Sequence, residues 1–341
     1  MAVGAFICGC SGAALTQSEI DFLGETNPWG FIVFKRNLDT PEQVRALTAS
    51  FRAAVGRANA PVFIDQEGGR VQRLGPPHWG VYPPAGAMGR AHADAPLRAI
   101  RSAWLVARLI AHDLHTVGIT ADCLPVLDIP QPGSHGIIGD RAYSSDPVLA
   151  SVLARSAMQG LLAGGVHPVI KHIPGHGRAR ADSHESLPVV DATLLELERI
   201  DFPPFAALSD AGMAMTAHVV YSAIDANRPA TLSPTIIDTV IRRAMGFDGL
   251  LMTDDLSMKA LSGTLGERTK AGLAAGCDMA LHCNGDLDEM REVAAAAGPL
   301  RGLALARARR ALGLAGKPEP FDRLRARAEA DWLLEQYARV A

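Results

Sequence analysis

Eight short apolar runs, rich in β-branched residues, alternate with helix-like stretches along the 341 residues of the chain. The runs are GAFICG, GFIVF, PVFID, GITADC, HPVIKH, MAMTAHVV, GLLMTD and DMALHC. Most intervals between them predict helices, at 41–56, 97–115, 147–163, 193–209, 234–245 and 286–297. Strands that alternate with helices form a parallel sheet, and eight such units predict a closed (β/α)8 barrel. We therefore expect one TIM-type barrel domain over 1–341, with the barrel at about 1–315 and a helical tail at about 316–341.

Polar side chains recur where the apolar runs end. The carboxyl ends of all strands in such a barrel converge on one face, and barrel enzymes carry out their chemistry there. One polar residue at a strand end signifies little, but six ends that bear Asp, His, Lys or Asn favour an active site at this C-terminal face. The residues are Asp65, Asp122, Lys171 with His172, His218, Asp254 and Asn284.

The segment KHIPGHGRARADSH concentrates a lysine, three histidines and an aspartate. Pro174, Gly175 and Gly177 forbid a regular helix, so these side chains extend from a loop. At about fifteen residues the loop is longer than the usual connection of a few residues, which favours a function. Asp182 stands two residues before His184, where its carboxylate can hold one ring nitrogen and raise the basicity of the imidazole. Such a pair can donate a proton in one step and accept one in the next.

A catalytic metal is an alternative use of the same residues. Imidazole and carboxylate ligands are offered by His172, His176, His184, His218 and Asp254. His172 and His176 have the four-residue spacing of a helical zinc motif, but the proline and glycine between them prevent one helical turn from presenting both. This disfavours the metal reading, and we expect neither a metal nor a cofactor.

Two further groups of residues bear on the ligand. Asp254 and Asp255 are adjacent at a strand end, where successive side chains point to opposite sides, so only one is expected to face the barrel mouth. The segments DQEGGRVQRL and IGDRAYSSDP add Asp65, Arg73 and Arg141, which accept and donate the hydrogen bonds of a hydroxyl-rich or amide-bearing ligand. Neither a strand-bound GxGxxG nor a GxxxxGK[ST] motif occurs, so the sequence predicts no nucleotide site.

Composition excludes other classes of function. The formal net charge is −3 at pH 7, which lacks the broad positive field that nucleic acid requires. The opening MAVGAFICGCSGAAL has no basic region and leads into a helix start at Thr16, which favours a first core strand over a leader. No other segment approaches the roughly 20 apolar residues of a membrane span. The five cysteines have neither zinc-ribbon nor disulfide-framework spacing, which suits a reducing compartment.

Taken in order, these motifs resemble glycoside hydrolase family 3, and specifically the bacterial β-N-acetylglucosaminidases of peptidoglycan recycling. The resemblance covers roughly residues 6–284. Its most specific part is the string KHIPGHG followed by DSH. The other motifs are GFIVFKRNL, FIDQEGGRVQRL, PVLDI, IGDRAYSSDP, MTAHVVY, LMTDDLSM and AGCDMALHC.

The resemblance implies a role for each candidate site residue. Asp254 would be the nucleophile, His184 the general acid and base, and Asp182 its partner. The usual glycosidase pair consists of two carboxylates, so a loop histidine as proton donor is a departure from it. The implied sugar-binding set is Asp65, Arg73, Arg141, Lys171 and His172.

The resemblance further implies a monomeric, cytoplasmic enzyme of the single-domain Gram-negative type. It would remove N-acetylglucosamine from the non-reducing end of 1,6-anhydromuramoyl saccharides and their peptides, without binding nucleic acid or membrane. Two alternatives stay open beside the metal-dependent hydrolase. One is a hexosaminidase that uses the 2-acetamido oxygen of the substrate as nucleophile, and the other is a catalytically silent sugar-binding sensor.

Overall fold

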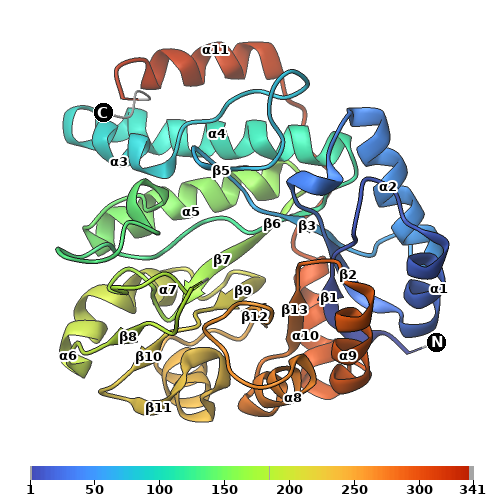
Figure 1. The fold of residues 1–341 in the computed structure, drawn as a ribbon. Coiled ribbons are helices and arrows are strands. Elements are labelled where there is room, and N and C mark those ends of the chain that lie inside the picture. Colours follow the sequence, from blue (N-terminus) through green and yellow to red (C-terminus); the bar gives the residue numbers. More distant parts are fainter. Residues whose placement is uncertain (1, 184, 338–341) are drawn as a thin grey trace.

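A computed structural model describes residues 2–183 and 185–337 of the protein. Its central feature is a closed barrel of eight strands in the order β1-β13-β12-β9-β7-β6-β3-β2, and all neighbouring strands are parallel. The barrel strands are β1 Gly4–Cys8, β2 Pro28–Ile32, β3 Val62–Ile64, β6 Ala121–Asp122, β7 His167–Ile173, β9 Met213–Thr216, β12 Leu250–Asp255 and β13 Met279–His282. Each of the eight apolar runs supplies one strand, so the predicted TIM-type barrel is confirmed (Figure 1).

Helices surround the barrel (Figure 1). They are α1 Gln17–Thr26, α2 Pro41–Ala54, α3 Ala85–Asp94, α4 Pro96–Thr116, α5 Pro147–Ala163, α6 Leu194–Glu196, α7 Pro203–Ala207, α8 Leu265–Ala275, α9 Leu287–Ala297, α10 Gly302–Leu312 and α11 Arg323–Leu334, with π-helical turns at η3 Leu197–Asp201 and η5 Ile236–Ala244. The described helices include none that is long and apolar enough to cross a membrane.

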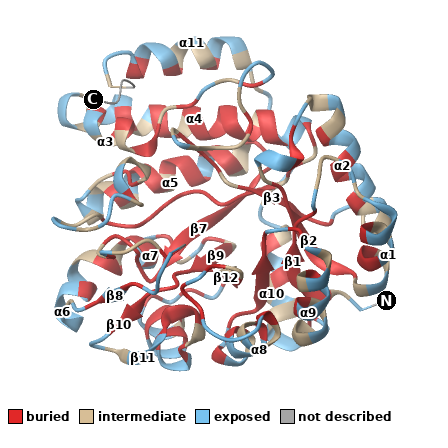
Figure 2. Ribbon diagram, in the orientation of Figure 1, coloured by how far each residue is buried: buried red, intermediate tan, exposed pale blue. Residues whose placement is uncertain are grey.

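The barrel strands are largely buried because both faces of the barrel wall are covered, and most of their side chains are apolar. Alternate side chains of β1 belong to two different clusters of buried residues. Ile7 packs with Phe63 and Met213 in the cluster inside the barrel, whereas Phe6 belongs to the cluster between the sheet and the helices. Figure 2 shows the strands buried and the helices buried on the side that faces them.

Helix α2 starts as the sequence predicts. The Thr40 side chain accepts a hydrogen bond from the Gln43 backbone N–H, and Pro41 occupies the first turn, where its missing N–H has no consequence. The prediction of one continuous helix at 193–209 is wrong, because this segment is divided into α6, the π-helical turn η3 and α7. Pro203 and Pro204 explain the break because neither has an N–H to donate to the preceding turn.

Two small sheets are additions that the sequence pattern did not predict. The hairpin β4 Gln66–Gly68 and β5 Val71–Gln72 follows barrel strand β3, and β8 Val189–Val190, β10 Val220–Tyr221 and β11 Asp225–Pro229 form a three-stranded sheet. The first carries part of the candidate site. The second begins where the long loop after β7 ends.

The C-terminal segment packs onto the barrel helices. Helix α11 lies along α4 (Figure 1), where Glu329 pairs with Arg101 at 2.8 Å. Glu319 and Phe321 lie just before α11, and both contact Arg108 of α4. The Arg108 guanidinium stacks over the Phe321 ring at 4.0 Å and donates a hydrogen bond to the Glu319 carbonyl. The described part of the tail therefore covers part of the outer surface of α4.

Candidate active site

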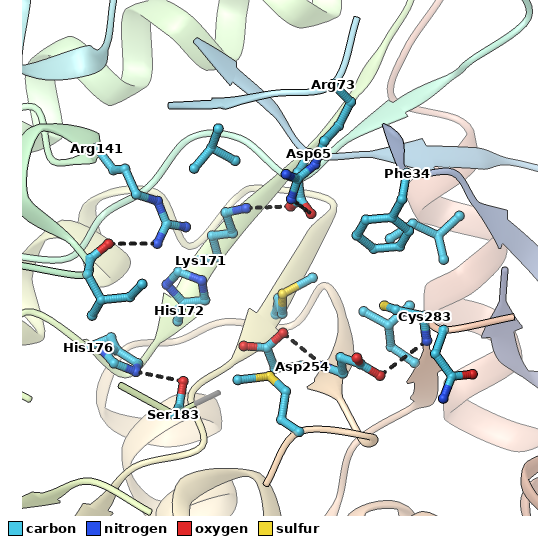
Figure 3. A pocket seen from close by; sticks show the side chains of 18 of the residues that line it. Phe34, Asp65, Arg73, Arg141, Lys171, His172, His176, Ser183, Asp254 and Cys283 are labelled. Atoms are coloured by element: carbon cyan, nitrogen blue, oxygen red, sulfur yellow. Dashed lines mark hydrogen bonds and ion pairs between the residues drawn. The ribbon is translucent and has the colours of Figure 1, made fainter. Parts of the chain in front are cut away.

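A cavity of about 380 Å³ opens at the carboxyl ends of the barrel strands. Several strands contribute to its wall, so residues far apart in the chain lie side by side (Figure 3). Of the strand-end residues, Asp122 and His218 are instead fully buried outside this wall. The candidate residues that line the cavity are Asp65, Arg73, Arg141, Lys171, His172, Asp254 and Asn284.

Ion pairs connect the cations and carboxylates on one side of the cavity. Lys171 Nζ lies 2.7 Å from Asp65 Oδ1 and 2.6 Å from Glu67 Oε1. Arg73 contacts the other oxygen of Asp65 at 3.3 Å, and Arg141 donates to both oxygens of Glu67 at 2.8 and 2.9 Å. The result is a continuous row of alternating charge along the cavity wall.

The pairing shifts the pKa values of Asp65, Glu67 and Lys171. Burial raises the pKa of the Asp65 carboxyl, but the charges of Lys171 and Arg73 outweigh it and hold that pKa well below its usual value. Burial likewise raises the pKa of the Glu67 carboxyl, but Lys171 and Arg141 lower that pKa to about 2. Burial lowers the pKa of Lys171, whereas the two carboxylates raise it by more. All of these groups are therefore ionised at neutral pH.

His172 is held by a carboxylate that does not line the cavity. Its Nδ1 lies 2.6 Å from Asp128 Oδ2, and Asp128 Oδ1 accepts the backbone N–H groups of His172 and His176 at 3.2 and 2.7 Å. Burial opposes ionisation of Asp128, but His172 lowers its pKa to about 2. The ionised carboxylate makes Nδ1 of His172 the hydrogen-bond donor, which turns Nε2 into the ring nitrogen available to a ligand.

Asp254 and Asp255 both line the cavity, which corrects the expectation that only one would face it. The reason is an irregularity in the pairing of β12 with β13 between Met252 and Asp255, which breaks the alternation of side chains. The two acids have different partners. Asp255 accepts hydrogen bonds from Ser257 and from the Cys283 backbone, whereas Asp254 accepts the Asp255 backbone N–H at 2.8 Å.

Asp254 is ionised at neutral pH. Burial raises the pKa of its carboxyl, but His218, His172, the Asp255 backbone N–H and Lys171 together outweigh burial, so the pKa lies below its usual value. His218 itself is fixed, because one ring nitrogen lies 2.7 Å from Thr231 Oγ1 and the other lies 3.0 Å from the Asp255 carbonyl oxygen. A carboxylate in this state is a nucleophile or a stabiliser of positive charge.

The loop after β7 is held by contacts within itself and with Asp201 of η3. His176 Nε2 lies 3.3 Å from Ser183 Oγ, and both side chains line the cavity. Arg178 pairs with the buried Asp201 at 2.6 Å. Asp182 is half-buried and directly precedes Ser183. The predicted acid and base, His184, lies outside the described residues.

The candidate metal ligands His172 and His176 lie on different elements. His172 lies in β7 and His176 in the following turn, with ring centroids 5.7 Å apart, so the two are not on one helix. Within residues 2–183 and 185–337, no group of three or more His, Cys, Asp or Glu side chains is arranged to hold a metal ion.

Sequence reasoning missed Glu67 and Asp128. Both lie in quoted motifs, DQEGGRVQRL and PVLDI, and an acid next to a buried strand is a signal that could have drawn attention to them. Their partners are far away in the chain, however, and only the folded barrel shows which cations they hold.

Known proteins resemble this chain in sequence and in fold. The model of the glycosyl hydrolase family 3 N terminal domain matches residues 13–309. The chain belongs to this family. It is 39% identical over 332 residues to a beta-hexosaminidase of Chromobacterium violaceum, covering 96% of this chain and 91% of that protein. A beta-hexosaminidase of Pseudomonas aeruginosa is 39% identical over 284 residues, covering 82% of both chains.

Solved structures of NagZ share the fold. The structure of NagZ from Neisseria gonorrhoeae in complex with N-trifluoroacetyl-D-glucosamine superposes with a TM-score of 0.88 at 31% identity, covering 98% of this chain and 99% of that one. NagZ from the same organism has also been solved in complex with a zinc ion, with a TM-score of 0.85 at 29% identity and 99% coverage of both chains.

Proposed function

We propose that this family 3 glycosidase is a retaining exo-β-N-acetylglucosaminidase. Its substrate would be the β-1,4 bond between a terminal N-acetylglucosamine and (1,6-anhydro)N-acetylmuramic acid, with or without a peptide. The observation that carries the proposal is an ionised Asp254 in the same cavity as the ion-paired Asp65, Lys171 and Arg141. The names of the relatives, beta-hexosaminidase, and the amino sugar bound to the gonococcal NagZ support the choice of sugar.

The cavity has the size and polarity for one sugar ring. At about 380 Å³ it lies in the lower part of the usual range for small-molecule sites, roughly 300–1,000 Å³. Asp65 can accept hydrogen bonds from hydroxyl groups, while Lys171, Arg73 and Arg141 can donate to hydroxyl or amide oxygens. Nε2 of His172 adds one further polar contact.

The proposed reaction has two steps. In the first, an Asp254 oxygen attacks the anomeric carbon, the glycosidic C–O bond breaks, and neutralisation of the leaving oxygen requires a proton. His184 would supply that proton, which leaves it neutral. In the second step neutral His184 removes a proton from water, the hydroxide oxygen bonds to the anomeric carbon, and the bond to Asp254 breaks. Two displacements at one carbon retain the β configuration.

Asp182 would serve the histidine and not the sugar. A carboxylate beside an imidazole fixes its tautomer and stabilises the protonated ring. The position of Asp182 next to the cavity-lining Ser183 supports this role. The same family resemblance supports the proposal of a cytoplasmic monomer that acts in cell-wall recycling, with muropeptide fragments as its substrates.

Trapping with a fluorinated N-acetylglucosaminyl donor tests the nucleophile. A retaining enzyme that uses Asp254 accumulates a covalent sugar on the peptide that contains it, detected by mass spectrometry after proteolysis. A substrate-assisted hexosaminidase yields no adduct on Asp254 and would replace the proposal. Release of p-nitrophenol from the aryl N-acetylglucosaminide by the wild-type protein is the control, and its absence would favour a sugar-binding sensor.

A further inference from the structure

Glu67 lies behind the cavity wall and contacts two of the cations that form it. Its side chain is 3% exposed, and it is part of the hairpin strand β4. Its partners, Lys171 and Arg141, line the cavity. Glu67 is therefore in a position to affect a bound sugar through these two residues without touching it.

Lys171 is oriented by two carboxylates together. An ammonium group has three N–H bonds in a tetrahedral arrangement. One of them donates to Asp65 Oδ1 at 2.7 Å, and the ammonium group also forms an ion pair with Glu67 Oε1 at 2.6 Å, so two carboxylates hold its nitrogen in place. In Figure 3 Lys171 ends between Arg141 and Asp65, beside the central space of the cavity. With Asp65 alone, the ammonium group would be held by one carboxylate and not by two.

Arg141 is held in a defined plane by the same carboxylate. Its Nε and one terminal nitrogen donate to the two oxygens of Glu67, and the other terminal nitrogen donates to the Ile137 carbonyl at 3.1 Å. A two-point contact between a guanidinium and a carboxylate fixes the orientation as well as the distance. The plane of the guanidinium, and with it the direction of its other N–H bonds, is thus set before a ligand arrives.

We infer that Glu67 is a positioning residue, which aims the Lys171 ammonium and the Arg141 guanidinium at the hydroxyl and amide oxygens of the bound sugar. The inference deepens the proposed function and rests on it. Pre-oriented donors bind more tightly because no side-chain freedom has to be lost when the ligand arrives. The charge of Glu67 also matters, because without it Arg141 would be left as a buried cation without its carboxylate.

The test compares Glu67→Gln with wild-type protein by calorimetric titration with N-acetylglucosamine and by kinetics on the aryl N-acetylglucosaminide. The amide is nearly the same size but cannot accept from both cations. We expect the dissociation constant and KM to rise at least tenfold, with a smaller change in kcat, at an unchanged binding stoichiometry. The matched control is Glu329→Gln, which removes a surface pair with Arg101 and should leave both constants within twofold of wild type.

A double-mutant cycle separates positioning from a general structural role. If Glu67 acts by orienting Lys171, then Glu67→Gln should weaken binding far less in a Lys171→Met background than in wild type. Equal loss in both backgrounds, or reduced stoichiometry at an unchanged dissociation constant, would overturn the inference. If Glu67→Gln does not fold, Glu67→Asp serves instead: it keeps the charge but is one methylene short of reaching both cations, so an unchanged dissociation constant would also refute the role.

The wild-type control keeps two failures apart. If wild-type protein neither binds N-acetylglucosamine nor hydrolyses the aryl substrate, the proposed function is wrong. If wild-type protein does both and Glu67→Gln matches it, only the positioning role of Glu67 is wrong.

Discussion

Gly177 offers a direct test of how the long loop is fitted to the barrel. A Cβ atom at this position would lie 2.1 Å from the Ile129 carbonyl oxygen, 2.3 Å from its carbon and 2.6 Å from the Ile129 nitrogen. The φ angle of Gly177 is outside the left-handed region, so close approach and not backbone conformation requires the glycine. We predict that Gly177→Ala forces the two segments apart.

The size of the effect follows from these contacts. Backbone atoms cannot rotate aside as a side chain can, so the segments must separate by about 1 Å to relieve the contact. Overpacking of this kind destabilises a protein by about 1–3 kcal/mol. One of the two segments continues to Asp182 and the other follows Asp128, which holds His172. A misplacement of about 1 Å near reacting groups can lower the rate by roughly 10²-fold.

Steady-state kinetics on the disaccharide and urea unfolding measure both effects. We expect kcat/KM of Gly177→Ala to fall roughly a hundredfold and the free energy of unfolding to fall by about 1–3 kcal/mol. Gly136→Ala is the matched control, because a Cβ there meets no atom within 4 Å. The reasoning is refuted if Gly177→Ala keeps kcat/KM within twofold and its free energy of unfolding within about 0.5 kcal/mol of wild type.

Four further outcomes are expected. Asp254→Asn should lose several orders of magnitude in kcat while still folding; an active Asp254→Asn beside an inactive Asp255→Asn would assign the nucleophile to the second acid. His184→Ala should lose much more activity on the disaccharide than on the aryl glycoside, whose phenolate leaves without a proton, and azide should restore turnover of the aryl substrate. Equal loss of activity on both substrates at every pH would contradict the role of His184 as the acid. Activity should persist in EDTA, and a loss that zinc reverses would support the metal alternative. Burial lowers the pKa of His167 to about 4, so the unfolded state binds more protons than the folded state between pH about 6.5 and 4. The free energy of unfolding should therefore decrease as the pH is lowered through that window, by up to about 1.4 kcal/mol per pH unit. In urea unfolding at several pH values, His167→Gln should show a weaker dependence of this free energy on pH.

The barrel could be predicted from the sequence because its signal is local. A strand that is covered on both faces is mostly apolar, so each of the eight runs is visible without knowledge of its neighbours. Helix starts are equally local, as Thr40 and Pro41 show. Local signals failed where the chain departs from regular periods, at the two prolines that divide the helix after 193 and at the irregular end of β12.

The candidate site divides in the same way. The ends of the strands bear Asp65, Lys171, His172 and Asp254, and parallel strands that close into a barrel must bring such residues to one face. The sequence by itself thus indicated that these four residues meet, although it grouped Asp122 and His218 with them, and both are buried outside the cavity wall. Their roles as nucleophile and sugar ligands stay predictions, as does that of His184.

Only the tertiary structure decided how those residues are held. Glu67 contacts Lys171, and Asp128 contacts His172, across 104 and 44 positions of the chain respectively. No period or motif specifies such a contact, because it depends on the relative height and tilt of two strands and on where a hairpin folds back. The pKa values depend on the same contacts, since a buried carboxylate stays ionised only where nearby positive charges and hydrogen-bond donors outweigh the effect of burial. The sequence determines the set of reactive groups, and the packing of the barrel determines their charge and direction.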